Sequence, residues 1–383
     1  MPKVEMKRLG DYIREVDVRN KDLKVTRLVG LTIDKAFIPS VANVIGTDLS
    51  NYKVIKKEQF ACSLMQVSRD GKMPVAMFED DMPAIMSPAY PLFEVVDTTK
   101  LLPQYLMMWF SRKEFDREAC FYAVGGVRGS LTWEDFCDMT LPIPPIARQR
   151  EIVAEYAMLA NRIRLNNRLI STLESTAQAL YRKMFVDNID KDHLPEGWRM
   201  GTLTDIAEYL NGLPCQNYET KEADFFPVLK IRELSQGFYD ENSNHVKGIP
   251  KEFVIENGDI IFSWSATLTI DIWCGGQCAL NQHLFKVIPK EYPKWFVYLW
   301  TKSHIDEWKH LISAKATSMG HIKREDLSSA CVIIPSNEIM TYLDGLFEPI
   351  IKTYSYKKQE TLQLTGLQSL LLAKMGCRKE EEV

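Results

Sequence analysis

The sequence repeats itself once along its whole length. Residues 134–184 recur at 325–375, an offset of 191 positions. Two stretches show the match most clearly. Leu131-Thr-Trp-Glu-Asp-Phe corresponds to Ile322-Lys-Arg-Glu-Asp-Leu, and Leu141-Pro-Ile-Pro corresponds to Val332-Ile-Ile-Pro. Solenoid repeats run about 20–50 residues, so this repeat is a duplication of a complete folding unit. We expect two similar units related by internal pseudo-twofold symmetry.

The bulk composition fits a protein with a core in each repeat. Hydrophobic residues make up 46% of the chain and charged residues 26%. The first 20 residues are too charged for a secretory signal, and no apolar run approaches the ~18 residues that span a membrane. These features predict a cytoplasmic protein. The net charge of −4 neither indicates nor excludes nucleic acid, because a DNA-binding protein needs local basic patches.

Cysteine and histidine spacing argues against a metal site. The eight cysteines are scattered, and the closest pair, Cys274 and Cys278, lacks the second half that a zinc ribbon requires. The six histidines show no metal-ligand spacing either. We expect reduced, buried thiols and no metal.

Each repeat ends in about 40 residues with helical periodicity. Apolar residues recur in the 4-3 alternation of a coiled-coil seam, and prolines precede both segments. At 1.5 Å per residue each helix is about 60 Å long. Neither helix can bury its seam alone, so we expect the two to pair as an antiparallel coiled coil. The predicted seam residues are Ile152, Tyr156, Leu159, Ile163, Ile170, Leu173 and Leu180 in the first helix, and Leu343, Phe347, Ile350, Leu364 and Leu371 in the second.

Both seams are interrupted at equivalent places, by Asn166 and by Lys357. A polar seam residue fixes register at a cost in stability, although both residues could instead face solvent. The first seam is the more apolar, so a fragment ending near Asp190 is expected to pair with itself better than the second half does.

The middle of the helices is basic. Arg162, Arg164 and Arg168 lie in the first helix, and Lys357 and Lys358 lie near the equivalent place in the second. These cations could lie near DNA phosphates or an acidic partner, or they could form a solvated face.

The region before each helix is rich in strand-forming residues. Asn257-Gly258 predicts a hairpin turn, 91–96 and 283–288 predict matching strands, and 103–115 and 293–309 predict matching helices. The predicted fold is α+β. Its segments are two mixed α/β domains at 1–143 and 198–334, long helices at 144–185 and 335–377, a linker at 186–197 and a tail at 378–383.

Motifs for several kinds of catalysis are absent. The sequence contains neither the phosphate loop GxxxxGK[ST] nor a G-x-G-x-x-G loop after a strand. Ser87-Pro-Ala-Tyr90 resembles the catalytic tetrapeptide of adenine aminomethyltransferases, but without a glycine-rich cofactor loop we interpret it as the turn before a strand. The pattern indicates a reader or a scaffold rather than a catalyst.

Taken together, the chain resembles the DNA specificity (S) subunit of Type I restriction–modification systems along its whole length. Three stretches of the second repeat carry the resemblance: Leu194-Pro-Glu-Gly-Trp with Leu203-Thr-Asp-Ile, Gly258-Asp-Ile-Ile-Phe-Ser-Trp-Ser, and Asn281-Gln-His-Leu-Phe. In the first repeat, 141–153 is similar to the family motif at the start of the long helix. The second repeat departs from that motif, because Ile334-Pro-Ser-Asn-Glu-Ile-Met lacks its glutamine.

The resemblance implies two target recognition domains, each reading one half of a split asymmetric double-stranded DNA site. The paired helices would set the spacing and dock two modification (methyltransferase) subunits, through which two restriction (translocase/nuclease) subunits join. No cofactor would bind this chain: S-adenosylmethionine, ATP and Mg²⁺ would be used by the partner subunits.

Candidate DNA-binding residues lie in loops and strand ends that correspond between repeats, where cations, hydroxyls and amides could contact phosphates and base edges. Any one of them could instead be an ordinary loop residue or, for the tryptophan, part of the core. They are Arg69, Lys72, Tyr90, Arg128 and Ser130 in the first repeat, and Ser263, Trp264, Ser265, Gln282, Lys315, Thr317 and Ser318 in the second.

Two other functions remain open from the sequence. One is a specificity subunit of a Type II system whose partner fuses nuclease and methyltransferase. The other is a coiled-coil scaffold that does not bind DNA.

Overall fold

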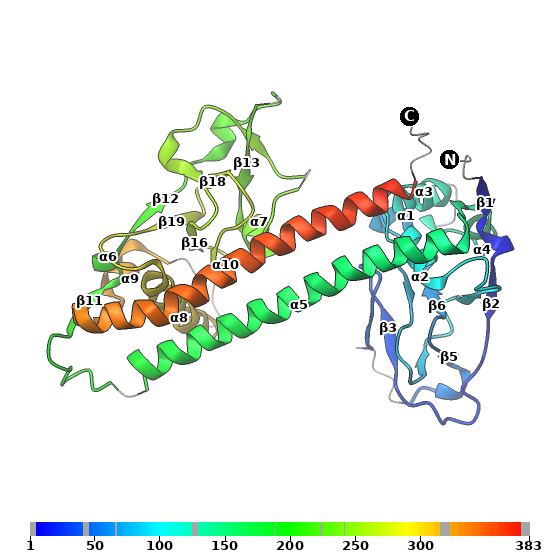
Figure 1. The fold of residues 1–383 in the computed structure, drawn as a ribbon, viewed down its shortest axis with the longest axis horizontal. Coiled ribbons are helices and arrows are strands. Elements are labelled where there is room, and N and C mark those ends of the chain that lie inside the picture. The colour runs from blue at the N-terminus through cyan, green and yellow to red at the C-terminus, as the bar shows by residue number, and fades with distance from the viewer. Residues whose placement is uncertain are drawn as a thin grey trace. The chain divides into compact units, whose positions relative to one another are not determined.

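The computed structural model describes residues 5–40, 46–65, 67–124, 129–187, 189–222, 224–240, 242–314 and 322–376. The chain forms two compact units: unit 1 comprises Met1–Asn161 with Thr365–Val383, and unit 2 comprises Arg162–Leu364. Each unit contains one mixed region and part of both long helices, α5 (Ile146–Phe185) and α10 (Asn337–Lys374) (Figure 1). The predicted domains instead kept each helix as a segment of its own. None of the described helices has a stretch long and apolar enough to cross a membrane.

A four-stranded antiparallel sheet organises the mixed region of unit 1. Its strand order is β2 (Ile13–Val16), β9 (Leu92–Val95), β6 (Phe60–Cys62), β7 (Val75–Met77). Three two-stranded pairs accompany it: β1 (Met6–Arg8) with β10 (Thr140–Pro142), β3 (Val29–Leu31) with β4 (Phe37–Pro39), and β5 (Lys53–Ile55) with β8 (Ala84–Met86). The short helices are α1 (Val67–Asp70), α2 (Pro103–Phe110), α3 (Lys113–Ala123) and α4 (Trp133–Asp138).

Aromatic rings fill the core between this sheet and α2. Phe60 and Phe93, paired across β6 and β9, stack with ring centroids 5.0 Å apart. Phe110 of α2 lies edge-on to both, at 6.0 and 6.2 Å. All three rings are fully buried, so the apolar alternation of the strands and the apolar face of α2 meet in one core.

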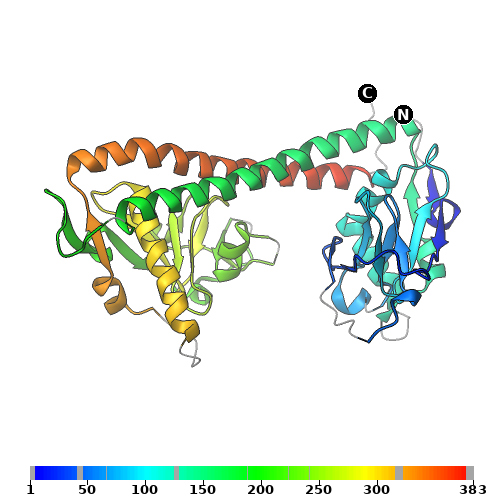
Figure 2. The same ribbon diagram turned by 90° about the horizontal axis from the view of Figure 1, so that it is seen from below.

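Unit 2 repeats this plan and adds a second sheet. The first sheet has the order β12 (Ala207–Asn211), β19 (Leu284–Pro289), β16 (Ile260–Ser263), β17 (Thr269–Ile272). The second has the order β14 (His245–Val246), β13 (Phe226–Leu229), β18 (Cys278–Leu280), β15 (Val254–Ile255), and β11 (Arg199–Thr202) pairs with β20 (Cys331–Ile334). The helices are α6 (Leu203–Ile206), α7 (Ile231–Gln236), α8 (Lys294–Ala314) and α9 (Arg324–Ser329). The longest of them, α8, is the yellow helix in Figure 2.

The two mixed regions share sheet order and register. Phe60 faces Phe93 in unit 1 as Phe262 faces Phe285 in unit 2. In both repeats the opening strand pairs with the strand that precedes the long helix, β1 with β10 and β11 with β20. The structure thus confirms the α+β fold and the duplication, together with the matching strands β9 and β19.

The predicted hairpin at Asn257-Gly258 is wrong in its pairing. The turn forms, with Gly258 at a φ of +93° that favours glycine. However, β15 pairs with β18, while β16 pairs with β17 and β19. A turn signal specifies the local reversal of the chain and not the partner of each strand, and both strands here find apolar neighbours elsewhere.

Two smaller expectations also need correction. Residues 103–115 form two helices rather than one, because α2 ends at Phe110 and the backbone of Arg112 is extended before α3 begins. Cys62, Cys215, Cys274 and Cys278 are buried, but Cys331 is exposed.

In unit 2 the long helices run antiparallel. Asn166 of α5 bonds Glu360 of α10, while Leu173 and Ala177, further along α5, line a small cavity with Ile350 of α10. Each predicted seam residue is buried or half-buried.

The other helix is not the only cover of these seams. Leu343 and Phe347 belong to the core of unit 2, and Ile152 packs against the core of unit 1. The mixed regions therefore bury much of the seam, which differs from the expectation that each helix would rely on the other.

An aromatic joint fixes the mixed region of unit 2 to α10. The rings of Trp295 and Phe347 stack with centroids 4.2 Å apart and an interplanar angle of 8°. Trp295 Nε1 donates to Asp344 Oδ1 at 2.8 Å. Nearby, the Tyr354 hydroxyl donates to Asp271 Oδ1 at 2.9 Å.

Gln149 makes the corresponding joint in unit 1. Its fully buried carboxamide accepts from Leu102 N at 2.9 Å and donates to Lys100 O at 2.8 Å and Pro144 O at 2.9 Å. The equivalent position in α10 is Met340, the missing glutamine noted above. The bond between Trp295 and Asp344 supplies a polar link there instead.

Replacing Gln149 by alanine is expected to destabilise unit 1 by about 2–4 kcal/mol, because three part-buried backbone groups lose their hydrogen-bond partner. Chemical denaturation of the full chain measures this loss. Gln178→Ala, at a half-buried position of the same helix, is the control and should cost less than about 1 kcal/mol. Equal losses for the two variants would contradict the assigned role.

Candidate nucleic-acid interface

The ends of β12, β16 and β19 meet at one edge of the first sheet of unit 2. Asn211 ends β12, Trp264 follows β16 and His283 precedes β19. Trp264 Nε1 donates to Asn211 Oδ1 at 3.0 Å, and its backbone N donates to His283 O at 3.4 Å. The half-buried indole packs against the core, with its ring centroid 5.9 Å from that of Phe285. Trp264 therefore links the ends of the three strands through its hydrogen bonds and its packing.

Ser263 and Ser265 support this edge from inside. They are 0% and 4% exposed. Ser263 Oγ donates to Ser265 O at 3.2 Å, and Ser265 Oγ lies 3.3 Å from His283 Nδ1. Because their side chains are buried and their hydroxyls form hydrogen bonds within the unit, we remove both serines from the predicted set of direct DNA contacts.

Gln282 and His283 are the polar groups that this edge presents to solvent. His283 is exposed and Gln282 half-exposed, with Gln282 Nε2 3.4 Å from His283 Nε2. A carboxamide both donates and accepts, so it can bond adenine on its base edge. The backbone is tight here: a Cβ on Gly212 would lie 2.2 Å from Asn281 O, and only glycine allows this approach.

The corresponding edge of unit 1 carries Tyr90. The tetrapeptide Ser87 to Tyr90 is a turn, with Tyr90 N donating to Ser87 O at 3.2 Å, and β9 begins at Leu92. This confirms its interpretation as the turn before a strand. Tyr90 is half-buried against a small apolar cluster that includes Phe78. It stands two residues before its strand, as Gln282 does before β19.

Arg69 and Lys72 are exposed at the end of α1. Arg69 Nε lies 2.7 Å from Asp70 Oδ1, and Lys72 Nζ lies 3.1 Å from Asp34 Oδ1. Exposed pairs of this kind contribute about 0–1 kcal/mol. Both cations can therefore exchange their carboxylate for a phosphate at little cost.

A buried ion pair anchors the segment that carries Lys72. Asp116 Oδ1 accepts from Met73 N at 3.1 Å and lies 2.8 Å from Lys35 Nζ. Burial lowers the pKa of Lys35, and the nearby Asp116 opposes that shift. The pair fixes the turn at Lys35 and the chain at Met73 together.

A similar backbone hydrogen bond in each repeat joins the segment after β6 or β16 to the residue that follows the glycine- and serine-containing loop. Leu131 N donates to Leu64 O at 2.8 Å in unit 1, and Ile322 N donates to Trp264 O at 3.0 Å in unit 2. In unit 1 this places half-buried Ser130 near Arg69, since a Cβ on Gly129 would lie 2.0 Å from Ser68 Oγ. Arg128, Lys315, Thr317 and Ser318 lie outside the described residues.

Most of the basic residues predicted in the helix middle have internal partners. Arg162 pairs with Glu360 at 2.7 Å, Lys357 also pairs with Glu360, and Lys358 pairs with Asp271. These three cations hold the structure together instead of forming a free basic stripe. Arg164 and Arg168 are exposed.

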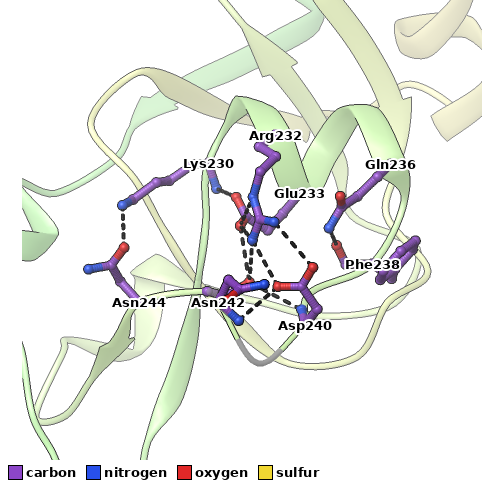
Figure 3. A network of polar contacts seen from close by, with 9 residues as sticks. Lys230, Arg232, Glu233, Gln236, Phe238, Asp240, Asn242 and Asn244 are labelled. Carbon is purple, nitrogen blue, oxygen red and sulfur yellow. Dashed lines mark hydrogen bonds and ion pairs between the residues drawn. The ribbon is translucent and has the colours of Figure 1, made fainter. Parts of the chain in front are cut away.

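A polar network that the sequence analysis missed holds the loop after α7 (Figure 3). Glu233 is 2% exposed and accepts from Arg232 NH2 at 2.6 Å and from Ser243 Oγ at 3.0 Å. Arg232 also bonds Asp240 through NH1 at 3.1 Å and NH2 at 3.0 Å. The hydrogen bonds to Asp240 and Glu233 raise the pKa of Arg232. Arg232 and Ser243 are eleven positions apart and the contacts follow no helical or strand period, so no sequence pattern marks them.

Among the described residues, no group of three or more His, Cys, Asp or Glu side chains is arranged to hold a metal ion.

Comparisons with known proteins show what this chain is similar to. Residues 195–363 match the family described as the Type I restriction modification DNA specificity domain. The specificity subunit of the Type I restriction enzyme MjaIX of Methanocaldococcus jannaschii is 20% identical over 308 residues, which cover 73% of this chain and 70% of that protein.

Solved structures support the fold. The S subunit of a Type-I restriction-modification system from M. genitalium covers 97% of this chain and 95% of its own, with a TM-score of 0.57 and 13% identity. The HsdS subunit from Thermoanaerobacter tengcongensis covers 98% of this chain and 96% of its own at 17% identity, with a TM-score of 0.37. Because the second score is below 0.5, the likeness in fold rests on the first structure. The chain is therefore similar to the specificity subunits of Type I restriction–modification systems, in the matched residues 195–363 and in its duplicated fold.

Proposed function

We propose that each mixed region reads one half of a split, asymmetric double-stranded DNA site. In this proposal Arg69, Lys72, Tyr90 and Ser130 contact one half-site, and Gln282 with His283 contacts the other. Arg128, Lys315, Thr317 and Ser318 belong to the same two loops by sequence. Two recognition modules joined by long helices would suit a divided site, because successive turns of the major groove are about 34 Å apart.

The repeated backbone contact of Leu131 with Leu64 and of Ile322 with Trp264 is the observation that carries this proposal. It supports two equivalent edges built on one scaffold. The side chains at these edges differ, since Tyr90 stands where the other repeat has Gln282. Different side chains on equivalent edges would read different sequences, which accounts for an asymmetric site.

The paired helices are proposed to set the spacing of the half-sites and to dock two modification subunits. Two restriction subunits would join through those. In the cytoplasm, S-adenosylmethionine, ATP and Mg²⁺ would serve these partners, while this chain contributes recognition and no catalytic group. The Methanocaldococcus jannaschii relative is a subunit of a Type I restriction enzyme, which supports assembly with other chains.

Salt dependence of DNA binding tests the proposal against a scaffold that does not bind DNA. We expect the complex of this chain with its modification subunits to bind site-containing duplex with an affinity that falls steeply with salt. Lys72→Ala should reduce the slope of log affinity against log salt by about 1, because one phosphate contact is lost. Lys251→Ala, at an exposed lysine that is not among the proposed contact residues, should leave the slope unchanged. Binding that does not respond to salt would favour the scaffold.

Gln282→Ala is expected to relax reading at one base of one half-site by about 1–3 kcal/mol. Competition binding with duplexes changed one base pair at a time measures this discrimination. Gln277→Ala is the matched control, since its exposed carboxamide bonds Glu256 Oε1 at 3.0 Å at another turn. Relaxation in both half-sites, or in neither, would remove Gln282 from the interface.

A specificity subunit with a Type II partner remains the second candidate function. The genes beside this one would distinguish the two kinds of system.

A further inference from the structure

One polar cluster interrupts the apolar seam of the helix pair in unit 2. Asn166 of α5 is 3% exposed, and its Nδ2 donates to Glu360 Oε2 of α10 at 3.0 Å. Arg162 NH2 lies 2.7 Å from Glu360 Oε1, and Lys357 Nζ lies 2.5 Å from Glu360 Oε2. We call these four residues the seam cluster. They show that Asn166 and Lys357, the predicted breaks in the seam, share one carboxylate, that of Glu360 in α10.

Glu360 is the centre of the seam cluster. Its hydrogen bonds with Lys357 and Arg162 lower its pKa to about 2, so the carboxylate is ionised at neutral pH. The side chains of Glu360 and Lys357 are only 18% and 15% exposed. Without the carboxylate, the Asn166 amide and the Lys357 ammonium would lose their shared acceptor in a mostly buried layer.

The duplication does not reproduce this carboxylate in α5. With the offset of 191, Lys357 corresponds to Asn166, Glu360 corresponds to Leu169 and Arg162 corresponds to Thr353. Each repeat thus supplies a different part of the seam cluster. Only a pair made of one α5 and one α10 contains all of it.

Two copies of α5 related by a twofold axis would form a different central layer. Two Arg162 side chains and two Asn166 amides would meet there, and Leu169 would occupy both positions that correspond to Glu360. The cations would have no anion and the buried amides no carboxylate acceptor. Two copies of α10 would suffer less, since Lys357 and Glu360 lie on the same helix and keep their own ion pair.

We propose that the seam cluster makes α5 a surface that fits α10 of the second repeat and rejects a second copy of itself. Polar seam residues select partners in this way by penalising the wrong pairing. The first repeat would then pair with the second repeat, and not with the first repeat of another chain. This revises the expectation that the first half self-associates better because its seam is more apolar. The proposal concerns helix pairing alone and does not depend on the proposed reading of DNA.

The test uses the complete protein, which is cleaved at one site in the linker after it has folded. A protease site is inserted between Lys191 and Asp192, both exposed in the linker, and the purified chain is cleaved so that all residues remain present. Preparations that differ in mass tag are mixed and allowed to exchange. Native mass spectrometry then counts pairs of the N-terminal half with the C-terminal half and pairs of N-terminal halves. We expect mixed pairs to exceed N-terminal homopairs by at least tenfold, the ratio that about 1.4 kcal/mol gives.

A gain-of-function variant makes the test specific. Leu169→Glu places a carboxylate at the position equivalent to Glu360, on a side chain that is 39% exposed. It should raise the share of N-terminal homopairs about tenfold. Leu165→Glu is the matched control, because that leucine is also exposed, at 46%, and lies one turn earlier. It adds the same charge at a position that does not correspond to Glu360, and it should leave the homopairs rare.

A loss-of-function variant tests the same interaction from the α10 side. Glu360→Gln keeps the shape of the side chain and removes its charge, and it should lower the preference for mixed pairs about tenfold. The proposal is overturned if wild-type N-terminal halves pair with each other as readily as with C-terminal halves. It is also overturned if Leu169→Glu promotes homopairs no more than Leu165→Glu. If Glu360→Gln prevents folding, the two leucine variants still decide, since both positions are on the surface.

Discussion

Replacing Phe347 by alanine is expected to lower the free energy of unfolding of unit 2 by about 3–5 kcal/mol. The ring of Phe347 is fully buried and stacks on Trp295 at 4.2 Å. Its loss removes the aromatic contact and leaves a cavity between α8 and α10. Denaturant unfolding followed by tryptophan fluorescence measures the change, because Trp295 reports on the joint itself.

Leu346→Ala controls for the loss of an apolar side chain on the same helix. Leu346 is next to Phe347 and 37% exposed, so it should cost less than about 1 kcal/mol. The joint also orients the second recognition domain on its helix. We therefore expect Phe347→Ala, at temperatures where it stays folded, to weaken binding to one half-site more than to the other. A stability loss equal to that of Leu346→Ala would show that the joint does not hold unit 2 on α10.

Arg232→Ala is expected to destabilise unit 2 by more than the loss of an exposed ion pair does, because it leaves the buried Glu233 carboxylate without its cation. Arg232 also holds Asp240 in place, so the loop between α7 and β14 should loosen (Figure 3). Hydrogen exchange should report faster exchange for the backbone amides near Ser243, and denaturation should report the energy.

Arg182→Ala is the matched control for this loss. Arg182 is an exposed arginine of unit 2 that pairs with Asp187 at 3.4 Å, and its removal should cost about 0–1 kcal/mol. If the two arginine variants lost the same stability, the network would be an ordinary surface pair.

The repeat and the seam were the parts of the fold most open to prediction from sequence. Periodicity of 4-3 spacing is a local property, and it gave α5 to within a few residues of Ile146–Phe185. The offset of 191 likewise predicted that β9 and β19 would match. Strand partners were less predictable: Asn257-Gly258 specifies a turn, but β15 pairs with β18, where Ile255 is buried in one apolar cluster with Cys278 and Leu280.

The candidate interface was harder to predict, for a physical reason. Serine occurs both in exposed loops and in buried turns, and nothing in the local sequence shows that Ser263 Oγ donates to Ser265 O inside the domain. Glu360 was missed because its role depends on Arg162, which is almost 200 residues away in the chain. Contacts between distant segments carry no local period, so they become visible only in the folded structure.

Methylation mapping tests the central claim most directly. The chain is co-expressed with its modification subunit, and methylated adenines are mapped across the host genome. The same is done for a chimera in which residues 198–334 come from a related specificity subunit. The account predicts one split asymmetric sequence for the original chain. In the chimera it predicts that one half of that sequence changes, while the other half stays the same. A continuous site, or a chimera in which both halves change, would contradict the account.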